Sequence, residues 1–438
     1  MGRLSAVLAW CLVAGVCPDV ARTGAAPADT LQWRFEAGAR SDWTTEQFYE
    51  DLFSDTTFLE RRLVDTPESR NAGVFSAVLT GTRNGRRQSF HAGTDVSLGD
   101  RLSRGAVHGN YRHESDRMRW TTTPRAEYER DRTFGRDLER LRLAADTRFR
   151  FGLGDGENRL EGGAGGEWMR ARGGGSQYLL DRAAVRTSLG FEHLPVLGTE
   201  WRAAWILTAR AFPDSSVRDH VEHGWEAHVR RDLAGGHSWM VETRGARRIA
   251  RRPGPDSRDR YVDAGLMAEG NLRFAPSWVA GLSAGLEALR YDEADSAVFF
   301  DYGVARARIM PRFERGTWTL AIGPRIEALE TTLGSLEEYR EVSAVLEFEG
   351  LLPSVWWSFA PEFGWREYRE PVSSAKGGPA DFGAHSSYRF IELNLYADHS
   401  LPGGVRVRLL GSGRHEAHTQ AADDARSFYI SADVRKIF

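Results

Sequence analysis

Hydrophobic and polar residues alternate along most of the chain. In the run 201–211, every odd position is apolar, whereas the even positions include Arg202, Thr208 and Arg210. Because successive side chains of a β-strand point to opposite faces, this pattern predicts a strand with one apolar and one polar face. The same division recurs in three later runs, 278–287, 341–348 and 391–398.

Turn signals between such runs alternate in length. Short turns rich in Gly, Pro or Leu are expected at 195–198, 234–236, 275–276, 315–316, 351–353 and 401–404. Longer polar stretches occupy 213–219, 253–259, 292–296, 331–337, 371–384 and 417–424. In the first half, strands are expected at 31–42, 72–82, 88–98, 102–113, 118–129, 138–151, 159–171 and 178–193.

Short turns on one edge and long loops on the other are typical of barrels that span a membrane, with the short turns on the periplasmic side. The sequence therefore predicts an all-β fold, a single transmembrane antiparallel up-and-down β-barrel of about 20 strands, within a range of about 18–22.

The segment Thr44 to Arg70 does not alternate. Phe48 and Leu52 are spaced four residues apart, as on one face of a short helical turn. We expect a long structured loop here. Two placements stay open: the loop folds into the lumen as a constriction, or it packs over the rim.

The last run, 427–438, alternates up to a terminal phenylalanine. Its apolar positions are Phe428, Ile430, Ala432, Val434 and Phe438. This ending resembles the final strand of bacterial outer-membrane β-barrels, although Lys436 stands where that family usually has an apolar residue. The resemblance implies a porin-like barrel in the outer membrane of a Gram-negative bacterium, inserted by the barrel-assembly machinery through this strand. It identifies no specific family.

The N-terminus has the form of a secretory signal. A single positive charge at Arg3 precedes an apolar run to Val16, which is too short to span a bilayer as a helix. We expect residues 1–28 to be removed after transport across the inner membrane, leaving residues 29–438 as the barrel. Both cysteines, Cys11 and Cys17, lie in the signal, so the mature chain can form neither disulfides nor a Cys-ligated metal site.

The net charge and the tryptophan content indicate which kinds of partner the protein binds. The 438 residues carry a formal net charge of −3, and no shift in composition divides them into domains. This near-neutral balance does not suggest a nucleic-acid partner. Several of the 14 tryptophans fall near strand ends, where their rings suit the bilayer interface. We therefore expect outer-membrane lipid around the barrel.

Two clusters contain residue types that ligate metals or catalyse hydrolysis. His220, Glu222, His223 and His228 are dense in metal ligands, but a strand spreads them over too great a length to converge on one ion. Asp219, His220, His385, Ser386 and Ser387 all fall near the loop side, where a hydrolase site could form, yet they match no hydrolase motif. The sequence assigns no catalytic residue, metal site or cofactor.

The polar face supplies the candidate functional residues. Those expected to line the lumen are Arg202, Arg210, Glu226, Arg306, Arg308, Glu347, Glu392, Arg406 and Arg408. Their arginines could form a positive wall that attracts anions. Alternatively, arginines and glutamates on this face could pair across strands and hold the wall in shape, which is the favoured use.

Three functions remain open. A passive channel for small polar solutes is favoured, because about twenty strands enclose a lumen too wide for side chains to fill. The first alternative is an outer-membrane hydrolase with its site at the extracellular rim. The second is a sealed structural or surface-binding barrel. The prediction is thus that the protein is not an enzyme, with the hydrolase left as the exception.

Overall fold

The structure is a computed structural model of the chain. It describes residues 30–54, 57–65, 67–83, 87–99, 102–132, 137–154, 157–173, 181–195, 198–251, 260–292, 301–331, 338–369, 386–419 and 423–438. The expected signal, residues 1–28, lies outside these ranges and stays a prediction.

Nearly all described residues belong to β-strands. The strands are β1 Thr30–Ser54, β2 Thr57–Asp65, β3 Glu68–Arg83, β4 Gln88–Gly99, β5 Leu102–Glu114, β6 Met118–Asp131, β7 Leu138–Leu153, β8 Asn158–Gly173, β9 Arg182–His193, β10 Thr199–Ala211, β11 His220–Leu233, β12 His237–Ala250, β13 Tyr261–Ala275, β14 Trp278–Tyr291, β15 Tyr302–Arg315, β16 Trp318–Thr331, β17 Tyr339–Leu351, β18 Val355–Tyr368, β19 Tyr388–Leu401, β20 Val405–His418 and β21 Ala425–Ile437. One 3₁₀ turn, Ser216–Arg218, precedes β11.

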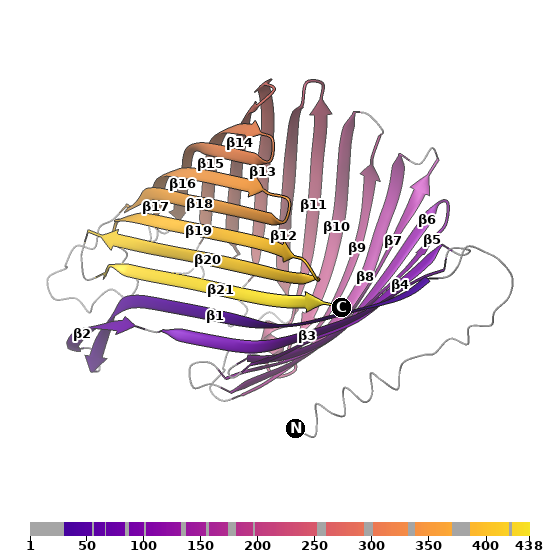
Figure 1. The fold of residues 1–438 in the computed structure, drawn as a ribbon, viewed down its shortest axis with the longest axis horizontal. Helices are drawn as coiled ribbons and strands as arrows, with labels where there is room; N and C mark the ends of the chain where they lie inside the picture. Colours follow the sequence, from indigo (N-terminus) through magenta and orange to yellow (C-terminus); the bar gives the residue numbers. More distant parts are fainter. Residues whose placement is uncertain are drawn as a thin grey trace.

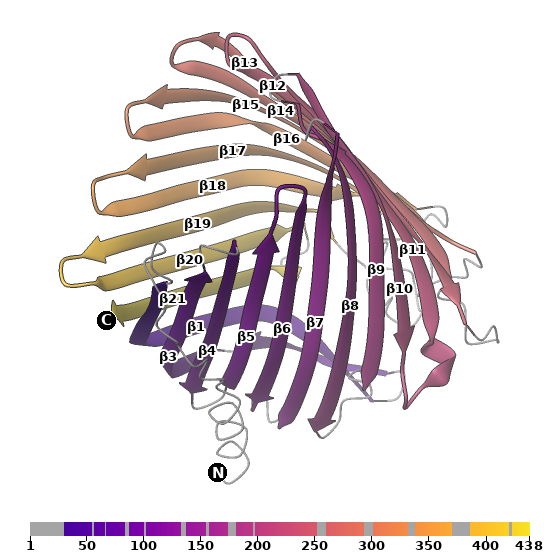
Figure 2. The same ribbon diagram turned by 90° about the vertical axis from the view of Figure 1, so that its right-hand side faces the viewer.

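The strands form one antiparallel sheet that closes on itself. Each strand from β3 onward pairs with its successor, and β1 pairs with both β3 and β21. Figure 1 shows the order of the strands, and Figure 2 shows β21 returning beside β1. Among the described residues, twenty strands make the closed wall, and this confirms the predicted up-and-down barrel.

The strand β2 belongs to a hairpin that extends the wall at one point. Its register with β1 runs from Gln47 opposite Asp65 to Ser54 opposite Thr57. In Figure 1 it lies at the end of β1 farthest from the C-terminus. The long structured loop expected between Thr44 and Arg70 is thus a β-hairpin over this part, and the four-residue spacing does not correspond to helical turns. Backbone pairing with β1 determines the conformation here, and a four-residue spacing of apolar side chains does not overcome it.

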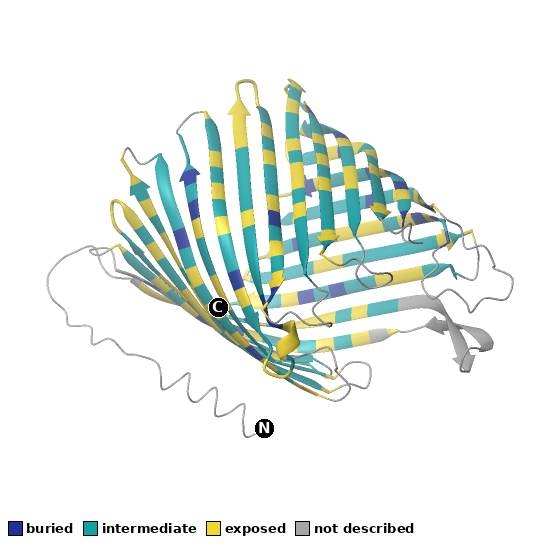
Figure 3. Cartoon of the chain, turned by 180° about the vertical axis from the view of Figure 1, so that it is seen from behind, coloured by how far each residue is buried: buried dark blue, intermediate teal, exposed yellow. Residues whose placement is uncertain are grey.

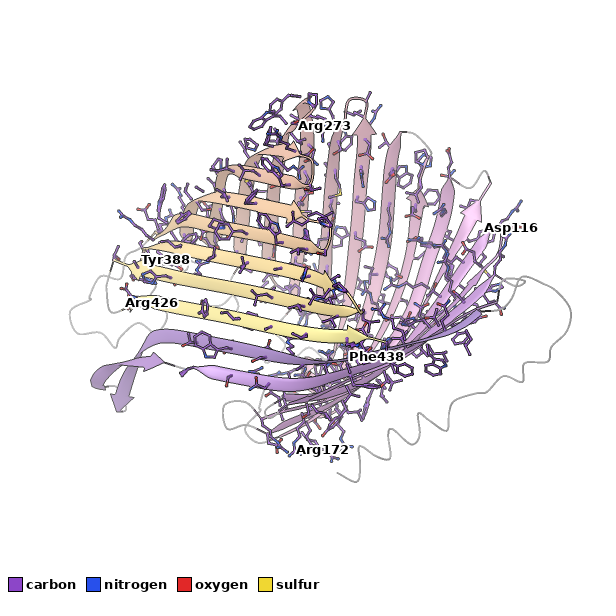
Figure 4. The ribbon with its side chains drawn as sticks, viewed as in Figure 1. Asp116, Arg172, Arg273, Tyr388, Arg426 and Phe438 are labelled. Atoms are coloured by element: carbon purple, nitrogen blue, oxygen red, sulfur yellow. The ribbon has the colours of Figure 1, made fainter. Side chains whose placement is uncertain are left out.

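The two ends of the barrel differ, as the turn signals predict. At one end the connections are tight, and glycines with positive φ close them, among them Gly235, Gly316 and Gly403. We call this the short-turn end. At the opposite, long-loop end, the gap between β18 and β19 runs from Tyr368 to Tyr388. Figure 4 labels Tyr388 near the long-loop end and Phe438 near the short-turn end.

In the described part of the chain, the wall is a single layer without a large core. In Figure 3 exposed and intermediate positions alternate along the strands, and buried positions are scattered. The clusters of buried side chains are small, such as Met310, Ala321 and Val345. Large apolar side chains are instead exposed, including Leu286 at 58% and Ile322 at 55%. No helix in the described ranges is long and apolar enough to cross a membrane.

Candidate functional site: the charged face of the barrel wall

The pairing register divides the wall into two faces. Trp205 lies opposite Leu189 on β9 and Trp225 on β11, so these apolar side chains share a face. Arg202 lies opposite Glu192 and His228, which share the other. Because directly opposed residues of antiparallel strands point the same way, the division continues around the barrel. Only one face is predominantly apolar between the strand ends, and it suits lipid.

All nine candidate lumen residues fall on the polar face. The register places Arg202 and Arg210 on β10, Glu226 on β11, Arg306 and Arg308 on β15, Glu347 on β17, Glu392 on β19, and Arg406 and Arg408 on β20. We assign this face to the lumen. That assignment stays a prediction, and the facing substitutions in the Discussion test it.

Ion pairs are complete on β19, β20 and β21. Asp398 accepts hydrogen bonds from Arg406 Nε at 2.8 Å, from Arg408 Nε at 3.0 Å and from the Tyr396 hydroxyl at 3.1 Å. Further arginine pairs of these strands join Arg414 to Glu392 and Glu416, and Arg435 to Asp433 and to Glu36 on β1. Every arginine of the polar face of β20 and β21 thus has a carboxylate partner.

Pairing also crosses the neighbouring strands β15 to β18. Arg325 Nη1 lies 3.2 Å from Glu362 and its Nη2 lies 3.0 Å from Glu327. Arg308 pairs with Glu347. Since Glu347 is on β17 and Arg308 is on β15, this bridge skips a strand. Such links hold three strands in register with one another.

Strands β7 to β10 differ, because their polar face carries more arginines than carboxylates. The arginines are Arg140, Arg142, Arg148, Arg150, Arg159, Arg182, Arg186, Arg202 and Arg210, and the carboxylates are Asp146, Glu161, Glu167, Glu192 and Glu200. Glu167 serves two arginines, Arg142 at 2.5 Å and Arg182 at 2.6 Å. Even with a shared carboxylate, some arginines of this region form no ion pair with a described residue.

Three arginines of this region have no ion-pair partner among the residues that the structure describes. They are Arg148 on β7, Arg186 on β9 and Arg210 on β10. Between the first two, β8 presents Gly163 and Gly165. A Cβ at Gly165 would lie 2.1 Å from Asp146 Oδ1, so the Asp146 side chain occupies the space over this glycine. The Asp146 carboxylate therefore lies over β8, between Arg148 on β7 and Arg186 on β9, without forming an ion pair with either in the described part of the chain.

On the next strands, β11 to β13, carboxylates outnumber arginines on the polar face. On β11 to β13, Glu222, Glu242, Asp263 and Glu269 lie on the polar face without an ion pair in the described part of the chain. The wall thus has a positive region on β7 to β10 beside an acidic one. Sequence reasoning found the residue types and their facing, but missed which of them pair.

The rim at the long-loop end contains a carboxylate held by several donors. Glu338 accepts hydrogen bonds from Arg369 Nη1 at 2.7 Å and from the Thr331 backbone N–H at 3.1 Å. Burial alone would raise the pKa of this carboxyl, but the hydrogen bonds from Arg369 and Thr331 lower it below its ordinary value. These contacts tie the connection before β17 to the end of β18.

The candidate hydrolase residues do not meet as a group. Asp219 accepts the backbone N–H of Phe212 and His220 contacts the carbonyl of Arg218, both beside β11. His385 lies outside the described residues. Ser387 accepts the backbone N–H of Tyr368 at 3.0 Å.

Ser386 instead meets residues that the sequence did not nominate. His418 Nδ1 lies 2.9 Å from Ser386 Oγ and 3.0 Å from the Ser386 carbonyl oxygen. The other ring nitrogen lies 3.4 Å from Glu416 Oε2. Ser386 Oγ also donates to Asp423 Oδ2 at 2.7 Å. No sequence signal joins these residues, because 32 positions separate Ser386 from His418.

No protein-family model matches the chain, and no curated protein matches its sequence. Several solved structures do match. The copper transporter OprC superposes with a TM-score of 0.58 at 10% identity, over 94% of this chain and 82% of that one. The siderophore receptor PirA from Pseudomonas aeruginosa gives a TM-score of 0.51 at 9% identity, over 94% of this chain and 81% of that one.

The chain has the fold of the outer-membrane β-barrels. At such low identity the likeness shows the fold alone. It confirms the resemblance drawn from the last strand.

Proposed function

We propose that this outer-membrane-type barrel is a passive channel for small polar solutes, with its long loops outside the cell and its short turns in the periplasm. The observation that carries the proposal is a closed wall of twenty strands whose polar face is lined with charge. Barrels of 16–18 strands already enclose an aqueous channel. Charged residues on the lumen side then replace part of the solute's hydration.

Free arginines on β7 to β10 support a preference for anionic groups. Arg148, Arg186 and Arg210 make no ion pair with any described residue. A guanidinium binds carboxylate or phosphate in a bidentate geometry. The acidic region on β11 to β13 would at the same time attract a cationic group of the solute. A small zwitterion or organic acid fits this arrangement.

The test is single-channel recording in planar bilayers with the refolded protein. We expect discrete conductance steps that scale with salt concentration. Folding is checked first, because a closed barrel should show a β-type circular dichroism spectrum and should migrate differently on a gel before and after boiling. Correctly folded protein that gives no conductance would exclude an open channel and leave the sealed barrel or the hydrolase.

A second candidate function, hydrolysis at the extracellular rim, is favoured by the contacts of Ser386. With the proton of His418 on Nε2 and donated to Glu416, Nδ1 can take the Ser386 proton as Oγ adds to an ester carbonyl. We rank this below the channel. Ser386 is only 3% exposed, and its hydroxyl is donated to Asp423, a contact that ties the start of β19 to the start of β21.

Labelling with a fluorophosphonate separates the two roles of Ser386. A nucleophilic serine forms a covalent adduct, which Ser386→Ala and His418→Ala abolish and the neighbouring control Ser387→Ala retains. If the wild-type protein forms no adduct in lipid vesicles, the hydrolase is excluded and Ser386 is a structural residue.

A further inference from the structure

Charge on the apolar face of the barrel is confined to the ends of the strands. At the long-loop end this face carries Arg130, Arg170, Arg172, Arg247, Arg290, Arg340, Arg389 and Arg426, with Glu139, Glu330 and Glu367. At the short-turn end it carries Arg231, Arg315 and Lys436. These sets cover the strand residues whose side chains the structure describes. Arginine is therefore concentrated at one membrane boundary.

Some of these arginines are already paired with aspartates just beyond the strands. The pairs are Arg130 with Asp137, Arg170 with Asp181, Arg247 with Asp292, and Arg290 with Asp301. Four others, Arg172 on β8, Arg340 on β17, Arg389 on β19 and Arg426 on β21, are exposed and have no ion pair with any residue in the described ranges. Arg340, Arg389 and Arg426 lie on alternate strands of one part of the wall, and we call these three the outer arginine row. Figure 4 labels Arg426 at the long-loop end.

The three members of the outer arginine row lie at one depth. Arg340 is opposite Glu367 on β18, whereas Arg389 is opposite Trp365, two residues nearer the short-turn end. Arg389 is opposite Ala417 on β20, and Arg426 is opposite His415, again two residues nearer that end. Each step is about 10 Å across the strands and about 7 Å along them. That slope, about 35°, is the strand tilt of a membrane barrel.

Apolar side chains begin directly below the row. Two residues further along their strands, Arg389 is followed by Ile391, which is 51% exposed, and Arg426 by Phe428, which is 39% exposed. Below Glu367 is Trp365, 52% exposed. The guanidiniums thus stand where the apolar band ends. In a bilayer this is the level of the lipid headgroups.

We propose that the outer arginine row binds phosphate groups on the lipid headgroups of the leaflet at the long-loop end. Phosphate suits the guanidinium fork, and the spacing of about 12 Å lets neighbouring arginines engage separate phosphates of one headgroup or of two. Glu367 is opposite Arg340, but no described carboxylate lies within ion-pair distance of any of the three guanidiniums. A lipid phosphate can therefore serve as their counter-ion. The proposal requires that the barrel spans a bilayer, and it is independent of whether the lumen conducts.

The test compares two matched triple variants in detergent micelles. One variant replaces the row by glutamine, Arg340→Gln, Arg389→Gln and Arg426→Gln. The control replaces the cations of the same face at the other end, Arg231→Gln, Arg315→Gln and Lys436→Gln. Each protein is titrated with diphosphorylated lipid A, and native mass spectrometry measures the bound fraction. Fully dephosphorylated lipid A is the second probe.

We expect wild type and control to bind the phosphorylated lipid alike, and the row variant to bind it on the order of 100-fold more weakly. The dephosphorylated lipid should not distinguish the three proteins. If the triple variant does not fold, Arg389→Gln and Arg426→Gln should each weaken binding about fivefold. Equal binding by wild type and row variant, or equal loss in both triples, would overturn the proposal. Displacement by millimolar inorganic phosphate would show a free-anion site and would also overturn it.

Discussion

The polar face of β19 to β21 and that of β7 to β10 have similar residue types but different pairing. On β19 to β21, arginines and carboxylates match, and Asp398 alone binds Arg406 and Arg408. On β7 to β10, Glu167 pairs with both Arg142 and Arg182, yet other arginines form no ion pair with a residue in the described ranges.

This difference separates two uses of charge in one wall. A paired guanidinium is fixed in position, and its field is largely cancelled by its partner. A free one keeps both its field and its hydrogen-bond donors for a solute. We infer that β19 to β21 hold the wall in shape, while β7 to β10 act on what passes through the lumen.

The largest effect should come from the face that both regions share. Leu207 on β10 and Leu393 on β19 lie on the apolar face. Replacing either by arginine at mid-membrane should lower the free energy of unfolding by about 2–4 kcal/mol. Urea unfolding from lipid vesicles measures the cost. Similar costs at both sites would place the regional difference on the polar face only, and a negligible cost at either site would reject the assignment of faces.

The next effect should separate the two regions in stability. Asp398→Ala leaves Arg406 and Arg408 without their shared partner, and should lower the free energy of unfolding by about 1–3 kcal/mol. Arg210→Ala removes a side chain that pairs with no described carboxylate, so it should cost at most about 0.5 kcal/mol. The same unfolding experiment compares them. Equal costs would remove the distinction between a paired and a free region.

Ion selectivity, in contrast to stability, should depend more on the unpaired arginines of β7 to β10 than on the paired ones of β19 to β21. Replacing Arg148, Arg186 and Arg210 by glutamine should lower the anion-to-cation permeability ratio by about two- to ten-fold, because fixed positive charge is lost from the lumen. Reversal potentials across a salt gradient measure the ratio. The shift should shrink as salt rises, since the screening length falls to about 10 Å at 0.1 M.

The control for selectivity is a charge-balanced change in the paired region. The double variant Asp398→Asn with Arg406→Gln removes one negative and one positive charge together. It should leave the reversal potential unchanged. A shift as large as that of the triple glutamine variant would show that pairing does not cancel the field of the wall.

The smallest effect is expected outside both regions, at the hairpin of β1 and β2. Gln47 and Asp65 are paired, so a two-residue turn can replace the residues between them. Because the hairpin continues the wall past its rim, this deletion should leave single-channel conductance unchanged. A rise in conductance would restore the lumen constriction that the sequence left open for Thr44 to Arg70.

Much of the barrel follows from the sequence because alternation is a local property. The facing of Trp201, Arg202 and Leu207 depends only on the period of a strand, and the register confirms it. The tight turns follow equally, since glycines such as Gly316 and Gly403 adopt the positive φ that they need. The final alternation up to Phe438 already indicated an outer-membrane barrel.

The sequence could not predict which side chains contact one another across neighbouring strands. The neighbouring sequence does not distinguish Arg210, which has no ion pair with a described residue, from Arg406, which pairs with Asp398. Pairing β1 with β21 brings positions almost four hundred residues apart into contact, such as Tyr429 with Asp42. Pairing of β19 with β20 likewise brings Ser386 to His418. Strand register also sets the common depth of the arginines on the outer face. Each of these depends on the stagger between strands, which only closure of the whole sheet determines.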